Sequence, residues 1–204
     1  MFTGLIEQTS KIENISVTSS GAKISFHSDF NDVKIGDSVA VNGVCLSITE
    51  IKNNIFSADI MKETLNLTNL KSLKNGDIIN LERAMSINSR FHGHIVSGHI
   101  DTTATVKRTT SDGFAKRIEF CCNSELIIKK GSITVNGVSL TVTEVLNNGF
   151  EVSLIPETLK NTNLTNLKIG DIVNIEYDQI AKYIKKFTEP KSEITLEFLK
   201  ENGF

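Results

Sequence analysis

Val41-Asn-Gly-Val-Cys-Leu-Ser-Ile-Thr49 returns 94 residues later as Val135-Asn-Gly-Val-Ser-Leu-Thr-Val-Thr143. The same offset aligns other matches, including Glu63-Thr-Leu65 with Glu157-Thr-Leu159. One offset that holds along half of the chain indicates a duplicated module, because a solenoid repeat is shorter and a small domain has about this length. The sequence therefore predicts two similar domains in tandem.

The composition is that of a globular chain that can divide into two such domains. The 204 residues are 39% hydrophobic and 23% charged, and the formal net charge is −2. Without a basic block or face, neither nucleic acid nor an anionic membrane is an expected partner. The N-terminus lacks the pattern of a signal peptide, and no apolar run approaches the roughly 18 residues of a membrane span. Three cysteines, two of them adjacent, form a poor disulfide framework, which favours a reducing cytoplasm.

Short β-branched segments with alternating apolar residues predict a mainly β architecture. In the first module the predicted strands are 11–17, 22–28, 38–41, 46–51, 55–60 and 78–82, with one short helix within 62–73. In the second module they are 103–108, 116–120, 133–135, 140–145, 150–155 and 172–177. Six short strands per module predict an all-β fold of two tandem six-stranded antiparallel barrels. Side chains fill so small a barrel, so a ligand is expected at strand ends or at an edge.

A helical tail follows the repeat. After Asp178, which is expected to cap the helix, Ile180, Tyr183, Ile184 and Phe187 share one helical stripe. A second helix is predicted over 192–200. Apolar stripes outside the repeat need a packing partner, which is another subunit in our preferred interpretation and the parent barrel in the alternative. The predicted divisions are residues 1–93, 94–178 and 179–204.

Residues that differ between the two modules are candidates for chemistry. His99 stands where the first module has Leu5, and the residues leave open a ligand-contacting or proton-handling role against a structural one. Cys45 corresponds to Ser139. A free cysteine is usually a small buried residue, and no neighbouring histidine in the sequence indicates an activated nucleophile.

Lys130 replaces Gly36 of the first module, and its alternatives are a surface lysine or a ligand contact. Gly4 and Gly98 occupy equivalent positions, where the missing side chain would let a flat ligand approach the backbone. Dinucleotide-binding, P-loop and serine-hydrolase motifs are absent from the sequence.

Three histidines lie close together in the sequence, at His92, His94 and His99. Only Asp101 is near enough to complete a set of metal ligands, and the spacing is not that of a usual zinc or iron site. We therefore expect no metal, and a solvated linker residue is the simpler interpretation of His92.

Six motifs in order resemble the riboflavin synthase family, in its alpha-chain type. They are Met1-Phe-Thr-Gly-Leu-Ile-Glu7, Asn42-Gly-Val-Cys-Leu-Ser-Ile-Thr49, Met61-Lys-Glu-Thr-Leu65, Gly93-His-Ile-Val-Ser-Gly-His99, Asn136-Gly-Val-Ser-Leu-Thr141 and Ile155-Pro-Glu-Thr-Leu159. The similarity runs into the tail from Ile194. Two positions depart mildly: His92 stands where the family commonly has glycine, and Ser47 where it commonly has threonine.

The resemblance implies a function that the composition does not. Each module would be a Greek-key barrel that binds one 6,7-dimethyl-8-ribityllumazine, and C-terminal helices would hold a homotrimer. One lumazine would donate a four-carbon unit to the other, giving riboflavin and 5-amino-6-(D-ribitylamino)uracil without a metal or an organic cofactor. The resemblance leaves open an association with lumazine synthase.

The resemblance also implies a set of ligand contacts at the positions that match the family's motifs. In the first module these are Gly4, Leu5, Ile6, Cys45, Leu46, Ser47, Asp59, Ile60, Met61, Lys62, Glu63 and Thr64. In the second module they are Gly98, His99, Ile100, Lys130, Ser139, Leu140, Thr141, Ser153, Leu154, Ile155, Pro156, Glu157 and Thr158, with Asp178 after the last strand.

A dismutation needs unlike sites, because one substrate gives carbon and the other takes it. We expect Ser38, Cys45 and His99 to be the catalytic residues. In this hypothesis the first module holds the acceptor, and His99 reaches in from the second module of a neighbouring subunit. The alternative function is a non-catalytic carrier of lumazine or flavin with the same fold.

Overall fold

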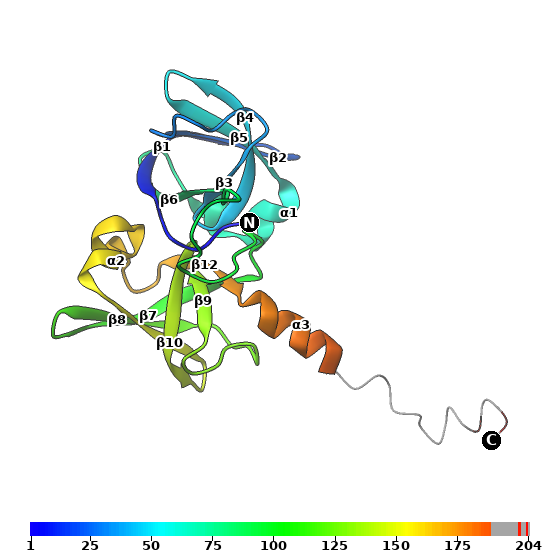
Figure 1. The fold of residues 1–204 in the computed structure, drawn as a ribbon. Coiled ribbons are helices and arrows are strands. Elements are labelled where there is room, and N and C mark those ends of the chain that lie inside the picture. The colour runs from blue at the N-terminus through cyan, green and yellow to red at the C-terminus, as the bar shows by residue number, and fades with distance from the viewer. Residues whose placement is uncertain (189–199, 201–202, 204) are drawn as a thin grey trace.

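Two closed β-barrels make up most of the chain in a computed structural model that describes residues 1–188, 200 and 203. The first barrel contains β1 (Gln8–Val17), β2 (Gly21–His27), β3 (Ser38–Val41), β4 (Val44–Lys52), β5 (Ile55–Met61) and β6 (Ile78–Arg83). The second contains β7 (Thr102–Asp112), β8 (Ala115–Cys121), β9 (Ser132–Val135), β10 (Val138–Leu146), β11 (Gly149–Leu154) and β12 (Ile172–Tyr177). The all-β prediction of two six-stranded antiparallel barrels is confirmed (Figure 1).

The two barrels have the same strand order, as the repeat requires. Around the first barrel the order is β1-β2-β5-β4-β3-β6, and β6 closes the sheet by pairing with β1. Around the second, β7 and β12 close the sheet in the same way. Apolar side chains that alternate along the strands fill each interior, with Phe26 and Phe56 in one barrel and Phe120 and Phe150 in the other. Neither barrel is an open ligand cavity, so ligands must bind outside the cores.

Short helices follow β5 and β11. The single helix expected within 62–73 is in fact two, α1 (Lys62–Leu67) and the 3-10 helix η1 (Asn69–Ser72). They are separated at Thr68, which has extended backbone and whose hydroxyl accepts the amide of Leu70 and so caps η1. The second barrel repeats the pattern with α2 (Pro156–Asn161) and η2 (Asn163–Asn166).

The helix α3 (Gln179–Thr188) follows β12 and points away from the barrels (Figure 1). Asp178 Oδ1 accepts the amide of Ile180 at 2.8 Å, so the expected helix cap is confirmed. The second helix expected over 192–200 lies almost wholly outside the described residues. Among the described residues, no helix is long and apolar enough to span a membrane.

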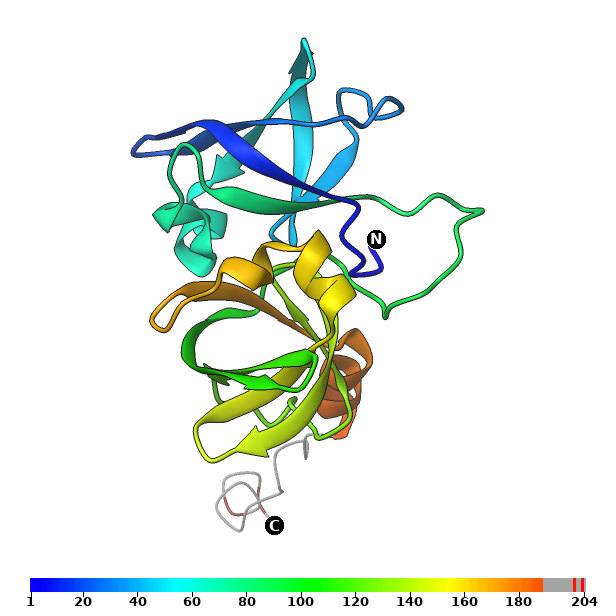
Figure 2. The ribbon, with the colours of Figure 1, turned by 90° about the vertical axis from the view of Figure 1, so that its left-hand side faces the viewer.

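Buried asparagines join the barrels, which lie one above the other in Figure 2. Asn80 of β6 donates from Nδ2 to Oδ1 of Asn163 and to the carbonyl of Asn136, both at 2.9 Å. In return, the backbone amide of Asn163 donates to Oδ1 of Asn80 at 2.7 Å, and at the equivalent place the backbone amide of Asn69 donates to Oδ1 of Asn174 at 2.6 Å. Four of these five residues are at most 5% exposed, and Asn163 is 8% exposed, so their hydrogen bonds replace most of the lost hydration and fix how the barrels meet, although Oδ1 of Asn69 has no partner.

Candidate functional site

Two equivalent segments run between the barrels, and both contain residues predicted to contact ligand. The first bridging segment is residues 2–6, and the second bridging segment is residues 96–100. They pair with each other in an antiparallel bridge between Phe2 and Val96. Their offset is that of the repeat, so each precedes the first strand of its own barrel.

Each bridging segment lies against a strand of the other barrel. The amide of Ser139, in β10, donates to the carbonyl of Gly4 at 2.7 Å. Equivalently, the amide of Cys45, in β4, donates to the carbonyl of Gly98 at 2.8 Å. Ile100 packs against the core of the first barrel. The segments are therefore exchanged between the two barrels of one chain.

This exchange corrects the grouping expected from the sequence. Gly4, Leu5 and Ile6 were grouped with Cys45 in the first module, but Ile6 packs against the core of the second barrel. His99 was expected to reach Cys45 from a neighbouring subunit, whereas its own chain places Gly98 beside Cys45. The offset assigns a residue to a repeat, but it does not show which barrel that residue contacts.

The two glycines are required by this close approach. Gly98 has φ +80°, and a Cβ at this position would lie 2.6 Å from Cβ of Cys45. Gly4 has φ +79°, and its Cβ would lie 2.6 Å from Cβ of Ser139. From the sequence we expected these glycines to admit a flat ligand, but strands of the opposite barrel occupy that space.

A buried carboxylate anchors each bridging segment to its own barrel. Glu82, in β6, accepts the amide and hydroxyl of Thr3 at 2.6 and 2.8 Å and the amide of Gly4 at 3.1 Å. Glu176, in β12, accepts the amide and hydroxyl of Ser97, both at 2.7 Å, and the amide of Gly98 at 3.0 Å. Burial raises the pKa of Glu82 above its ordinary value, although the donors from Thr3 oppose the shift.

We call the region around Cys45 site one. Strands β4 and β5 pair as far as Ile48 and Ala58, so Cys45–Ser47 and Asp59–Met61 leave the pairing at the same end. Lys62, Glu63 and Thr64 continue into α1, and the second bridging segment lies alongside Cys45. Ser38, in the adjacent strand β3, pairs with Ser47. The structure thus gathers most of the first set of predicted contacts at one barrel end.

We call the equivalent region around Ser139 site two. Ser139–Thr141 and Ser153–Ile155 leave the pairing of β10 with β11 beyond Val142 and Val152, and Pro156, Glu157 and Thr158 continue into α2. The first bridging segment lies alongside. Its Leu5 also lines a pocket of about 270 Å³ with Glu82 and Arg83, but that pocket is bounded by residues between Thr3 and Arg90 and not by β10, β11 or α2.

Some predicted contacts have structural roles or lie towards the margin of a site. Asp178 caps α3, as described above. The backbone amide of Lys130 donates to the carbonyl of Val142, which follows Thr141. Lys130 has φ +66°, and Gly36, at the equivalent position of the first repeat, has φ +95°. Leu46, Ile60 and Leu154 are buried and belong to the barrel cores.

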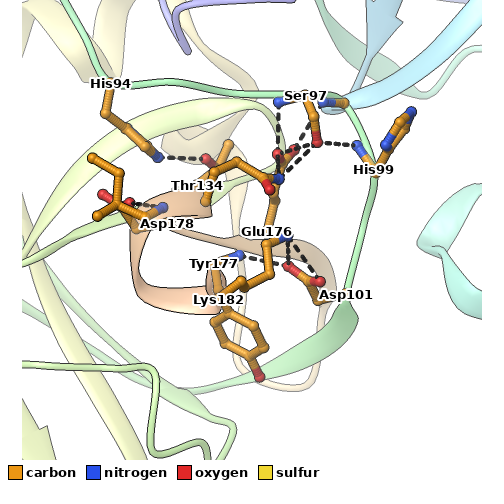
Figure 3. A network of polar contacts seen from close by, with 12 residues as sticks. His94, Ser97, His99, Asp101, Thr134, Glu176, Tyr177, Asp178 and Lys182 are labelled. Atoms are coloured by element: carbon orange, nitrogen blue, oxygen red, sulfur yellow. Dashed lines mark hydrogen bonds and ion pairs between the residues drawn. The ribbon is translucent and has the colours of Figure 1, made fainter. Parts of the chain in front are cut away.

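His94 lies in site two, although the sequence raised it only as a possible metal ligand. Its Nδ1 lies 2.7 Å from Oγ of Ser139, and its Nε2 lies 3.2 Å from Oγ1 of Thr134, which Figure 3 shows beside it. Burial lowers the pKa of His94, against the opposing charges of Asp178 and Glu176. The imidazole is therefore neutral at neutral pH, and its Nδ1 can either donate a hydrogen bond to Ser139 or accept one from it.

The two sites differ in polarity despite their common plan. Ser139 faces His94, whereas Cys45 packs with buried Phe2, Ala40 and Val96. The repeat explains why the sequence did not reveal this difference: the counterpart of His94 would precede Met1. Glu82 and Glu176 carried a usable signal, because each is an acidic residue that follows an apolar residue at the same place in the last strand of its barrel.

Figure 3 shows how the second bridging segment connects to α3. Gln179 Nε2 donates to Oγ of Ser97 at 2.9 Å and to Oε1 of Glu176 at 3.2 Å. Lys182 forms an ion pair with Asp101 at 2.9 Å. No cluster of three or more potential metal-ligating side chains occurs among the described residues.

Comparisons with known proteins agree with this duplicated architecture. The model of the lumazine binding domain matches residues 3–84 and again residues 97–178. A riboflavin synthase of Actinobacillus pleuropneumoniae is 46% identical, and the alignment covers 100% of both chains. The chain belongs to the riboflavin synthase family. A riboflavin synthase of Bacillus subtilis (strain 168) is 41% identical, again over 100% of both chains.

Solved structures with the same fold include LumP in complex with 6,7-dimethyl-8-(1'-D-ribityl) lumazine. It is 24% identical, has a TM-score of 0.80 and covers 86% of this chain and 98% of that one. LumP in complex with riboflavin has a TM-score of 0.81 at the same identity, covering 87% and 99%. At this identity the likeness supports the fold alone.

Proposed function

We propose that this member of the riboflavin synthase family converts two molecules of 6,7-dimethyl-8-ribityllumazine into riboflavin and 5-amino-6-(D-ribitylamino)uracil. One substrate loses the four-carbon unit that the other gains, so the reaction balances without an added oxidant. The observation that carries the proposal is the pair of equivalent but unlike sites, in a chain whose full length aligns with riboflavin synthases.

Positioning would supply much of the rate. Holding two reactants in a reactive geometry can lower a barrier by roughly 7–11 kcal/mol. Each site has backbone groups at strand ends that can orient a flat heterocycle, and the polar side chains near them can stabilise developing charge. We assign the acceptor to site one, with Ser38, Cys45 and His99 as the catalytic residues, and the donor to site two.

Proton transfer at the two sites would differ. A methyl group of one substrate must lose a proton before its carbon bonds to the other substrate, and the neutral imidazole of His94 hydrogen bonds to Ser139 within site two. At site one, the exposed His99 follows Gly98, whose carbonyl accepts the amide of Cys45. This division of roles extends the polarity difference between the sites to the chemistry.

We propose a homotrimer held by the C-terminal region, in the cytoplasm. The stripe on α3 supports the assembly, because Ile180, Tyr183, Ile184 and Phe187 are all exposed in the single chain. All three cysteines are free, as suits a reducing compartment. Residues 1–93, 94–178 and 179–204 remain our proposed divisions. Sedimentation with added lumazine synthase would test for an association between the two enzymes.

Fluorescence distinguishes an enzyme from a carrier. Purified protein mixed with ribityllumazine should produce riboflavin fluorescence that grows over many turnovers, with about half a molecule of riboflavin formed per lumazine consumed. A carrier would bind the lumazine and leave its spectrum that of bound, unchanged ligand. Boiled protein provides the control for spontaneous conversion.

A further inference from the structure

Each bridging segment adjoins a candidate site on one barrel and is anchored by a carboxylate of the other barrel. Glu82 holds Thr3 and Gly4, and Gly4 contacts Ser139 of the second barrel. Glu176 holds Ser97 and Gly98, and Gly98 contacts Cys45 of the first barrel. Each carboxylate therefore lies on one barrel, while the bridging segment that it holds contacts the site of the other barrel.

We propose that Glu82 and Glu176 are positioning residues that act crosswise, Glu176 shaping site one and Glu82 shaping site two. The proposal rests on the proposed function only in treating the bridging segments as walls of ligand sites. Neither carboxylate needs to touch a substrate for this role.

The contacts suit a positioning role because they fix backbone rather than side chains alone. Each carboxylate accepts two consecutive amides and one hydroxyl, which determines both the place and the direction of the segment. Hydrogen bonds to a charged acceptor are about twice as strong as neutral ones. An amide of the same shape would turn its NH₂ group toward one of these donors and lose part of the set.

Site one has an additional connection that site two lacks. Gln179, the first residue of α3, donates to both Ser97 and Glu176, and its counterpart in the first repeat is Met85, which has no side-chain amide. The second bridging segment is thus coupled to α3. Loss of the Gln179 amide should affect site one in the same direction as loss of the Glu176 charge.

Thiol labelling measures each site separately and requires no turnover. In a protein carrying Cys121→Ser and Cys122→Ser, Cys45 is the remaining thiol and reports on site one. Adding Cys45→Ser and Ser139→Cys to that protein moves the thiol to site two. The rate of reaction with a nitrobenzoate disulfide reagent then reports how often each bridging segment leaves its strand.

The expected pattern is crossed. Glu176→Gln should speed labelling of Cys45 by about tenfold, the ratio that matches loss of one charge-assisted hydrogen bond. It should leave the labelling rate of the thiol from Ser139→Cys unchanged within about twofold. Glu82→Gln should do the reverse. Glu176→Asp, which keeps the charge, should fall between wild type and Glu176→Gln. Exposed Glu13→Gln is the matched control and should change neither rate.

Any of three results would overturn the proposal. Each glutamate could change the labelling rate of the thiol on its own barrel, both could change both rates equally, or neither could change a rate. If Glu176→Gln fails to fold, Gln179→Leu carries the test with the same expected direction. Labelling would still be informative if the protein proved to be a carrier, so failure of the proposed function and failure of the crosswise role are distinguishable.

Discussion

Nδ1 of His94 lies 2.7 Å from Oγ of Ser139, although 45 positions separate them in the chain. The contact holds the chain just before the second bridging segment against β10 of the second barrel, and it places a neutral imidazole at site two. Burial lowers the pKa of this imidazole, so protonation is resisted in the folded protein. Stability that depends on His94 should therefore respond to pH.

Replacing His94 by asparagine should make the pH dependence of unfolding shallower. With its folded pKa lowered, His94 contributes stability that is present above its unfolded value of about 6.5 and is lost as pH falls through the folded pKa. Urea unfolding of wild type and His94→Asn between neutral and mildly acid pH should show the difference in unfolding free energy shrinking as pH falls. A constant difference would contradict this prediction. Exposed His92→Asn is the control.

Gly98→Ala should impair both stability and turnover. The new Cβ would lie 2.6 Å from that of Cys45, and the positive φ adds strain, so we expect a loss of about 2 kcal/mol or more. Gly36→Ala is a matched control, because Gly36 has φ +95° with nothing within 4 Å of a Cβ. It should cost about 1 kcal/mol from strain and leave turnover near normal. Equal losses in the two variants would show that contact with Cys45 is unimportant.

Asn80→Ala should destabilise the contact between the barrels. The change removes hydrogen bonds to Asn163 and Asn136 and leaves buried polar atoms without partners, at a cost of about 2 kcal/mol or more. Thermal unfolding compared with exposed Asn166→Ala measures this effect. A melting temperature equal to that of the control would argue against an essential asparagine network.

Ile184→Glu should weaken subunit association without unfolding the barrels. A charge within the apolar stripe of α3 would have to be desolvated in an interface, which strongly disfavours assembly. Analytical ultracentrifugation should show a smaller species than wild type. Lys186→Gln changes the net charge equally on the same helix and should leave the sedimentation unchanged. A wild-type protein that sediments as a monomer would remove the basis for the trimer.

Lys130→Gly should raise stability while lowering turnover if the lysine contacts substrate. Lysine at φ +66° carries strain of about 1 kcal/mol that glycine does not. Chemical unfolding measures the first effect, and steady-state kinetics with ribityllumazine measures the second. A variant that is stabilised and fully active would make Lys130 a surface residue with a strained backbone.

The barrels could be predicted from sequence because alternation and turn residues are local properties. Ala22 to Phe26 alternate between buried and more exposed positions along β2, as their composition indicates. The exchange of bridging segments is not local: Gly4 and Gly98 have equivalent neighbours in sequence, and only packing decides which barrel each contacts. The contact of His94 with Ser139 escaped prediction for a related reason, since His94 has no counterpart in the other repeat against which to compare it.

The exchange of bridging segments also limits what a single repeat can do. A half-chain ending in the linker would keep Cys45 but lose Gly98, and it would keep Gly4 but lose Ser139. Such a half could complete a site only by docking with a second copy of itself, Gly4 of one against Cys45 of the other. An ancestor with one repeat would have had two identical pockets for that reason, and covalent fusion then freed the copies to evolve opposite roles.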